Sequence, residues 1–271
     1  MNRKTKLAVM FIVVIAVGIL IAQRGQMPQS FDTTVRRNGV PTWEKDAQFK
    51  HDVFTFVRVR YNSYNDNWRR GKWSTDFPDS DLNFSYRLQE LTSFKVDPNG
   101  KILSLTDKEL FDYPFLYIIE PGDMWLSEDE VAALRRYCLN GGFVMVDDFW
   151  GEREWYNFEQ QMKRVFPKRE LKELPLEHEI FNNVYKLAEK PQIPSIHTYW
   201  NGYTSERPDA QTPHYKALFD DKERIMMIVC HNTDLGDGWE REGMDPSYFK
   251  EYSEKWSYPL GINIVTYAMT H

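Results

Sequence analysis

The sequence predicts an α/β fold with a mainly parallel sheet, and two features of the chain predict it. The first is a short apolar strand at 115–120, a helix that begins near Ser127 and a second apolar strand at 143–146. Strand, helix and strand at this spacing form a βαβ unit, whose two strands are expected to be parallel. The second feature is a pair of apolar runs at 53–60 and 225–230, which predict further strands. An α/β sheet is therefore the expected architecture.

The N-terminus carries an export or anchoring signal. Basic residues at 3–6 precede an apolar run over 7–22 without a polar face, as in a signal peptide or a single membrane span. The run has about 16 residues, which is marginal because a spanning helix needs about 20. Cleavage after Ala22 is disfavoured by Leu20. Both alternatives stay open, with the anchor favoured. Either one places the domain in the periplasm, anchored in the inner membrane or secreted.

The chain therefore divides into three parts. Residues 1–23 form the hydrophobic signal or membrane-anchor helix, and 24–50 form a polar linker that contains two prolines. Residues 51–271 are long enough to bury one sizeable core and form a single α/β domain.

Recognisable signals bound several helices of the domain. Ser127 and Glu130 have the spacing of a capping box, and 140–142 (Asn-Gly-Gly) supplies a left-handed stop. Thr106 and Glu109 have the same capping-box spacing and predict a short helix.

Other segments are assigned from periodicity. Residues 81–91 alternate like a strand but also repeat at helical spacing, and we interpret them as a helix. Further helices are predicted over 152–166, ended by Pro167, and from Pro259 onward. Residues 171–223 lack a clear period and predict long loops with short elements over one end of the sheet.

Charge and cysteine content limit the possible partners. The formal net charge is −6, with Lys and Arg scattered, so nucleic acid is not an expected partner. Cys138 and Cys230 fall on the inner face of a helix and at the end of an apolar strand, as small core residues do. A disulfide between them stays open.

Candidate ligand-binding residues follow the predicted strands, because open parallel sheets bind ligands at the carboxyl ends of their strands. They are Arg58, Arg60, Tyr61, Glu120, Asp147, Asp148, His231, Asn232 and Asp234. Arg58 and Arg60 share one strand face and could clamp a carboxylate, phosphate or sugar. The alternative is a structural ion pair with Glu120 or Asp148.

The two consecutive aspartates are expected to point to opposite sides of a regular strand, and we favour Asp148 for the ligand crevice. Its carboxylate could bind a cation or accept a hydrogen bond from a substrate. The alternative, which weighs more, is that Asp148 caps the helix that follows. Asp147 stays a second candidate.

A later segment is rich in oxygen ligands. His231 and Asp234, with Asp237 and Glu240 after them, could hold Ca²⁺ or another divalent ion. Their spacing matches no metal motif, so a solvated acidic loop that turns at Gly236 is the favoured alternative. The sequence specifies neither a cofactor nor a particular metal.

Aromatic residues are frequent in segments interpreted as loops, and could contact carbohydrate or protein. They are Trp68, Trp73, Tyr199, Trp200, Tyr203 and Trp239. Many would instead fasten loops onto the sheet. Glycine-rich phosphate loops, serine nucleophile elbows and zinc-protease motifs are absent from the sequence.

Several strings together resemble the bacterial domain of unknown function 4159 (DUF4159), and the resemblance covers about 53–271. They are FTFVRVRY from Phe54, TDFPDSDLNFSYRLQEL from Thr75, YCLNGGFVMVDDFWG from Tyr137, LEHEIFNNVY from Leu176, HNTDLGDGWE from His231 and YPLGINIVTYAMTH from Tyr258. The family is similar in fold to the class I glutamine amidotransferase-like superfamily, which implies a flavodoxin-like three-layer sandwich. True amidotransferases carry a cysteine at the elbow that Asp147, Asp148 and Phe149 occupy here. The resemblance thus implies no glutamine hydrolysis by that mechanism.

Two functions remain open. The leading hypothesis is a non-catalytic or diverged binding module that faces the periplasm and recognises a small polar ligand, a glycan or an envelope protein. The alternative is a hydrolase in which Asp148 and His231 act as acid and base or as metal ligands.

Overall fold

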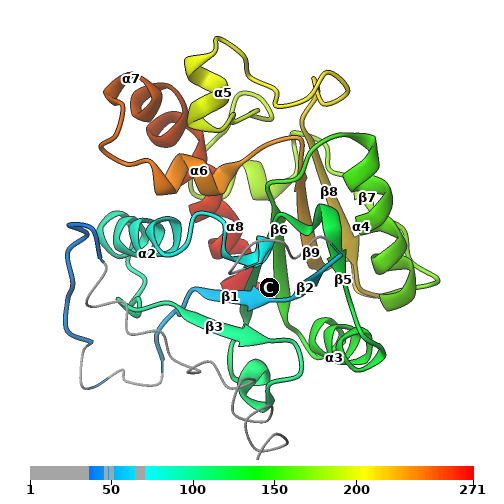
Figure 1. The fold of residues 1–271 in the computed structure, drawn as a ribbon. Helices are drawn as coiled ribbons and strands as arrows, with labels where there is room; N and C mark the ends of the chain where they lie inside the picture. The colour runs from blue at the N-terminus through cyan, green and yellow to red at the C-terminus, as the bar shows by residue number, and fades with distance from the viewer. Residues whose placement is uncertain (1–36, 46–47, 49–51, 65–70) are drawn as a thin grey trace, which may run out of the picture. The chain divides into compact units, whose positions relative to one another are not determined.

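Seven strands form one sheet in the computed structural model, which describes residues 37–45, 48, 52–64 and 71–271. The strand order is β3-β1-β4-β6-β9-β8-β7 (Figure 1). The strands are β1 Val57–Arg60, β3 Lys101–Ser104, β4 Phe115–Ile119, β6 Phe143–Asp147, β7 Lys172–Glu173, β8 His214–Phe219 and β9 Ile225–His231. From β3 to β9 all neighbours are parallel, and β8 is antiparallel to both β9 and β7. A separate antiparallel pair joins β2 (Asn62–Ser63) to β5 (Met124–Trp125). The predicted α/β class with a mainly parallel sheet is confirmed.

The βαβ unit has the form that the sequence predicts. β4 and β6 pair in parallel from Phe115 opposite Phe143, and α3 (Glu128–Leu139) connects them. The Ser127 side chain accepts from the backbone of Glu130 in a complete capping box, and Gly141 has a φ of 103° just after the helix. Successive residues of β6 are buried in two different cores, which explains its uninterrupted apolar sequence.

Helices cover both faces of the sheet (Figure 1). Besides α3, the α-helices are α2 Asp79–Leu91, α4 Gly151–Val165, α5 Ile196–Trp200, α6 Leu235–Glu240, α7 Pro246–Tyr248 and α8 Tyr258–Thr270. On one face of the sheet, α3 and α4 contribute Leu134 and Phe158 to a buried core. On the other face, α2, α6 and α8 contribute Phe84, Trp239 and Ile264 to a second core. Short 3₁₀ segments are η3 Lys72–Ser74, η4 Lys108–Asp112, η5 Pro121–Asp123 and η6 Glu179–Phe181, and η7 Phe249–Ser257 is π-helical.

Some local predictions are confirmed and others are wrong. Residues 81–91 are helical within α2, and both cysteines are buried free thiols. The short helix η4 begins after Asp107 without a side-chain cap, so the capping box predicted at Thr106 is wrong. The stretch 171–223 contains β8, a six-residue strand that we did not predict.

The predicted signal or anchor segment and most of the linker lie outside the described residues. Within the described part of the chain, no helix is long and apolar enough to cross a membrane.

The strand order reverses at β1. The chain adds β3 on one side of β1 and then places β4, β6 and β9 on the other side. In open α/β sheets, ligands bind outside the carboxyl ends of the strands at such a reversal. The segments that follow β1, β4, β6 and β9 meet at this edge and carry the candidate site.

Candidate functional site

Three neighbouring parallel strands end in residues with left-handed backbone. Glu120 after β4 has a φ of 46°, Asp148 after β6 a φ of 55°, and Asn232 after β9 a φ of 60°. This conformation is uncommon outside glycine, and it clusters at functional sites. At Asp148 it turns the chain from β6 toward α4, so the side chain leaves the regular alternation of the strand.

Three carboxylates converge at this edge of the sheet. One oxygen from each of Asp76, Asp148 and Asp234 lies within 4.8 Å of the others. Asp148 and Asp234 are 7% and 3% exposed. Asp76 is half-buried, but its Oδ2 is shielded from solvent. We name Asp76, Asp148 and Asp234 the first triad.

Each member of the first triad keeps an oxygen without a described donor. Asp148 Oδ1 accepts from Trp150 Nε1 at 3.0 Å, and Asp234 Oδ1 accepts from Asp237 N at 2.7 Å at the start of α6. Asp76 Oδ2 has no hydrogen-bond partner among the described residues. No ion pair in the described part of the chain reaches these three carboxylates.

A second triad shares Asp76 with the first. Oxygens of Asp76, Asp237 and Glu240 also lie within 4.8 Å of one another. Here a cation is present, because Arg241 approaches Asp237 Oδ1 at 3.2 Å and Glu240 Oε2 at 2.7 Å. Asp237 Oδ2 additionally accepts from Ile196 N at 2.6 Å.

Asp147 lies beside the first triad and is fully buried. Its Oδ2 accepts from Tyr117 Oη at 3.0 Å and from Gly236 N at 2.9 Å. A methyl group on Gly236 would come within 2.8 Å of both Tyr117 Oη and Asp76 Oδ2, which places these groups together. Asp147 Oδ1 has no partner among the described residues, and such a buried, unpaired oxygen is costly unless something binds it.

Burial and mutual repulsion oppose ionisation of these acids. Burial raises the pKa of Asp148 well above its ordinary value, and the negative charge of Glu120 adds to the effect. The pKa of Asp234 is raised well above the ordinary value by burial and then by Asp148, and that of Asp76 by burial and then by Glu240. Burial raises the pKa of Asp147 to about 7. A bound cation would reverse this by stabilising the charged carboxylates.

Comparison with known families adds one finding. The family model described as "Domain of unknown function (DUF4159)" matches residues 55–269. The chain belongs to this family. The matched residues include both triads, so the acidic cluster lies within the DUF4159 domain. No curated protein matches the chain.

The helix-capping interpretation of Asp148 is wrong. In the DUF4159 domain the N-cap of α4 is Trp150, whose own side chain makes no capping hydrogen bond. The first two amides of the helix donate instead to Asn232 Oδ1 and Asp209 Oδ2. Instead, Asp148 holds the Trp150 indole and faces the other carboxylates. The predicted solvated acidic loop after His231 is also wrong. Residues 235–240 form the helix α6, and five of its six residues are buried.

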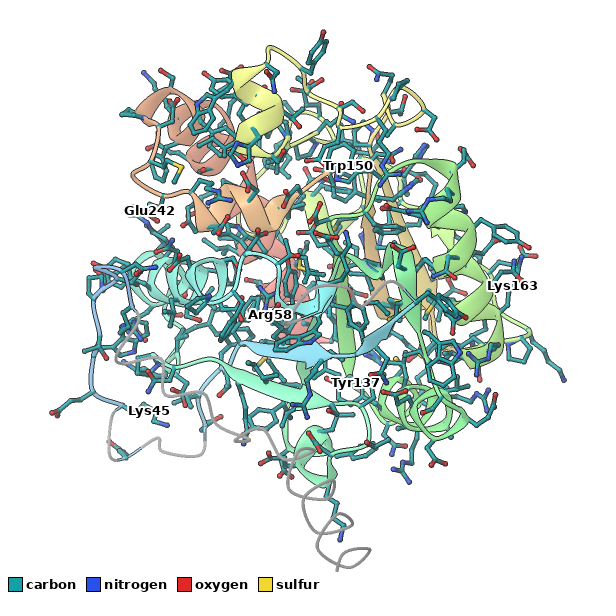
Figure 2. All side chains as sticks on the ribbon, in the orientation of Figure 1. Lys45, Arg58, Tyr137, Trp150, Lys163 and Glu242 are labelled. Atoms are coloured by element: carbon teal, nitrogen blue, oxygen red, sulfur yellow. The ribbon has the colours of Figure 1, made fainter. Side chains whose placement is uncertain are left out.

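Arg58 lies inside the domain rather than at an open ligand site, as Figure 2 shows beside β1. Its guanidinium pairs with Asp81 of α2 at 2.5 Å and also donates to the carbonyls of Trp73 and Thr75. With Ser80 Oγ as a further acceptor, all five N–H bonds are directed at protein atoms. The structural alternative is therefore the one observed, but its partner is Asp81. Of the two partners that we expected, Glu120 instead accepts from Lys72 and Thr75, and Asp148 accepts from the Trp150 indole.

Arg60 does not share the environment of Arg58. It is half-buried, and its Nε and Nη2 donate to Ser104 Oγ on β3 at 3.3 and 3.1 Å. The two arginines therefore form no common clamp in this structure, because Arg58 pairs with Asp81 of α2 whereas Arg60 donates to the uncharged hydroxyl of Ser104 on β3.

His231 has aromatic rather than acidic neighbours. Its ring packs against Phe149 and Trp155 at centroid distances of 4.7 and 5.0 Å and stacks with His214 at 6.1 Å. Nε2 lies 3.2 Å from the Gly151 carbonyl, and no described hydrogen bond joins His231 to Asp148. The predicted acid-base pair is thus not assembled, although both residues follow neighbouring strands.

The aromatic residues divide between core and surface. Trp239 is fully buried, whereas Trp200 and Tyr203 are exposed, and Trp73 and Tyr199 are partly buried. Trp68 lies outside the described residues. Surface hollows of about 850 and 660 Å³ surround the turn between β8 and β9, at the amino end of β9. They lie away from the acidic cluster, whose residues follow the carboxyl ends.

Sequence reasoning missed Asp76. This residue follows no predicted strand directly, and nothing in its local pattern indicates that it reaches the ends of β6 and β9. Its φ of 60° is a tertiary feature that the surrounding loop enforces.

Proposed function

We propose that this DUF4159 domain is a divalent-cation-dependent binding module of the cell envelope. The cation would be held by the first triad, and a polar, oxygen-bearing ligand such as a glycan would complete its coordination. The observation that carries the proposal is the convergence of two buried carboxylates, Asp148 and Asp234, and the half-buried Asp76, none of which forms an ion pair in the described part of the chain.

Electrostatics favours a cation over a purely structural role. Three negative charges within 4.8 Å repel one another strongly where burial lowers the local dielectric. Nearby cations are already paired, Arg58 with Asp81, Lys72 with Glu120, and Arg241 with the second triad. The unpartnered oxygens of Asp76 and Asp147 are an independent sign that a ligand belongs here.

The donor set indicates the class of metal. All three ligands are carboxylates, and hard oxygen ligands suit Mg²⁺, Ca²⁺ or Mn²⁺ rather than Zn²⁺ or Cu²⁺. Three protein ligands leave coordination positions for water or for hydroxyl and carboxylate oxygens of a ligand.

The test is titration of the full chain, purified in mild detergent and stripped with a chelator, with Ca²⁺, Mg²⁺ and Mn²⁺. We expect stabilisation by about 2.7 kcal/mol at a cation concentration a hundred times the Kd. Asp148→Asn should abolish binding, whereas Glu152→Gln, an exposed carboxylate on the first turn of α4, should leave it unchanged. No binding by the parent chain, or equal binding by Asp148→Asn, would refute the proposal.

One observation supports a hydrolase as a second candidate. Asp148 occupies a strand-to-helix turn with a φ of 55°, which is the kind of turn that presents nucleophiles in other α/β enzymes. The binding module predicts no turnover of aryl ester and aryl phosphate substrates by the Mn²⁺-loaded chain. Cation-dependent turnover that disappears in Asp148→Asn would establish the hydrolase instead.

Location and wider kinship are part of the same proposal. The basic residues and apolar run at 3–22 support a domain that faces the periplasm, either anchored in the inner membrane or released after cleavage. The helices on both faces of the sheet and the elbow-like turn at Asp148 support a flavodoxin-like relation to the class I glutamine amidotransferase-like superfamily. Protease protection of the domain in intact spheroplasts would contradict the periplasmic location.

A further inference from the structure

The two triads that share Asp76 differ in how their charge is balanced. No described cation forms an ion pair with the first triad, although Arg58 and Arg241 act on Asp76 at longer range, whereas Arg241 contacts two members of the second triad directly. The geometry otherwise resembles a two-metal site, in which two cations about 3.5–4 Å apart share a bridging ligand. Asp76 stands where such a bridging carboxylate would stand.

We infer that Arg241 occupies the place of a second cation, so that the site binds one divalent ion and not two. This inference rests on the proposed function, because it assumes that the first triad binds a cation. Arg241 is then a positioning residue that fixes the cation stoichiometry and holds the second triad in place without touching the ligand.

The contacts of the second triad support this role. Nε of Arg241 donates to Asp237 Oδ1 at 3.2 Å, and Nη2 lies 2.7 Å from Glu240 Oε2 as an ion pair without a hydrogen bond, so one guanidinium spans both carboxylates. Asp237 Oδ2 is occupied by the amide of Ile196 and the hydroxyl of Tyr248. A second cation would have to displace Arg241, which has partners on both carboxylates and is 24% exposed in its side chain.

The first triad lacks any such substitute. The carboxylates of Asp148 and Asp234 each accept one described hydrogen bond, in both cases at Oδ1. Asp76 Oδ2 accepts none among the described residues. Asp147, whose Oδ1 is buried without a described partner, reaches this triad through Gly236, whose amide donates to Asp147 Oδ2 and whose Cα faces Asp76 Oδ2. The asymmetry therefore assigns the exchangeable cation to the first triad and the fixed charge to the second.

The experiment measures bound Mn²⁺ per full chain by elemental analysis and titration, with electron paramagnetic resonance to detect coupled ion pairs. We expect one Mn²⁺ in the parent chain and an uncoupled spectrum. Arg241→Gln should raise the stoichiometry to two and give a coupled spectrum, because Asp76 would then bridge two ions. Adding Glu240→Gln to that variant should return the stoichiometry to one.

Arg87→Gln is the matched control. Arg87 pairs with Glu242 nearby and has 32% side-chain exposure against 24% for Arg241, but it contacts neither triad. Its variant should bind one Mn²⁺, as the parent does.

Each outcome separates the inference from the proposed function. No Mn²⁺ in the parent chain would refute the proposed function itself. Two ions in the parent, or a folded Arg241→Gln that binds only one, would overturn the inference and leave the cation site standing. If Arg241→Gln does not fold, Glu240→Gln alone decides, since the inference expects the Kd to change less than about threefold. A larger loss of affinity in that variant would overturn it.

Discussion

His231 offers a test of the packing around the strand ends, because the fold keeps its imidazole neutral. The residue is 3% exposed, and its ring packs against Phe149 and Trp155. Burial is the main cause that lowers the pKa of His231 from 6.5 to about 4; the hydrogen bond to the Gly151 carbonyl opposes this shift, and His214 and Lys216 add smaller lowering effects. We therefore expect His231 to oppose folding in mildly acidic solution.

The sign and size follow from proton linkage. Below pH 6.5 the unfolded chain binds a proton at His231, whereas the folded chain stays neutral until the pH approaches 4. The contribution of His231 to the free energy of unfolding is therefore complete above pH 6.5 and is lost as the pH falls toward 4. At 1.36 kcal/mol per pKa unit, the loss is about 2 kcal/mol at pH 5 and about 3 kcal/mol below pH 4.

Urea unfolding of the full chain at pH 7.5 and pH 5.0 measures this effect, with His231→Gln as the variant that cannot titrate. The buried carboxylates titrate in both proteins and cancel in the comparison. The parent should lose about 2 kcal/mol more than His231→Gln between the two pH values. His197→Gln, which removes an exposed histidine, should behave like the parent. Equal losses in the parent and His231→Gln would refute the reasoning.

Three further perturbations test the packing and the site. Asp81→Asn removes the counterion of a fully buried guanidinium and should lower the free energy of unfolding by about 3–5 kcal/mol, measured by urea denaturation; a loss below 1 kcal/mol would contradict a buried charge. Gly236→Ala places a methyl group 2.8 Å from Asp76 Oδ2 and should weaken Mn²⁺ binding about tenfold. As a control, Gly261→Ala places a methyl group 2.6 and 2.7 Å from the rings of Phe84 and Trp239. It should lower the free energy of unfolding by about 1–3 kcal/mol without changing the affinity for Mn²⁺. Both cysteines are fully buried, with the pKa of each thiol raised by burial, so a thiol reagent should label neither until the chain unfolds; rapid labelling of the native chain would exclude this packing.

The elements predicted correctly are those whose signals are local. Strands β4, β6 and β9 are buried on both faces, so their sequences are continuously apolar. The capping box at Ser127 satisfies the backbone of α3 within four residues and needs no distant partner. By contrast, β8 alternates half-buried and buried residues over only its first four positions, at the antiparallel side of the sheet, and such a short pattern is hard to distinguish from a loop.

The candidate site was predictable only in part. Position near a strand end identifies some of its residues, but it does not reveal which charged residues are buried against a distant counterion. Asp148 directly follows β6 and Asp234 lies in the short segment after β9, so the rule for strand ends identifies them. Arg58 was expected near a strand end but is the second residue of β1 and lies inside the domain, where Asp81 of α2 pairs with it from 23 residues away. Whether a charged strand-end residue is buried thus depends on a counterion that another element supplies, which no local pattern reveals.

Stability alone gives no reason for the first triad to exist. Bringing three buried carboxylates within 4.8 Å of one another disfavours the folded state whenever they are ionised, and no described cation pairs with them. The fold does pair such groups at the same edge of the sheet. Arg241 forms ion pairs with Asp237 and Glu240, the two carboxylates that share Asp76 with the first triad. A structural cluster would be expected to use that solution throughout. The first triad has no such ion pair at the carboxyl ends of β6 and β9, and the divalent cation that we propose there would supply the missing positive charge.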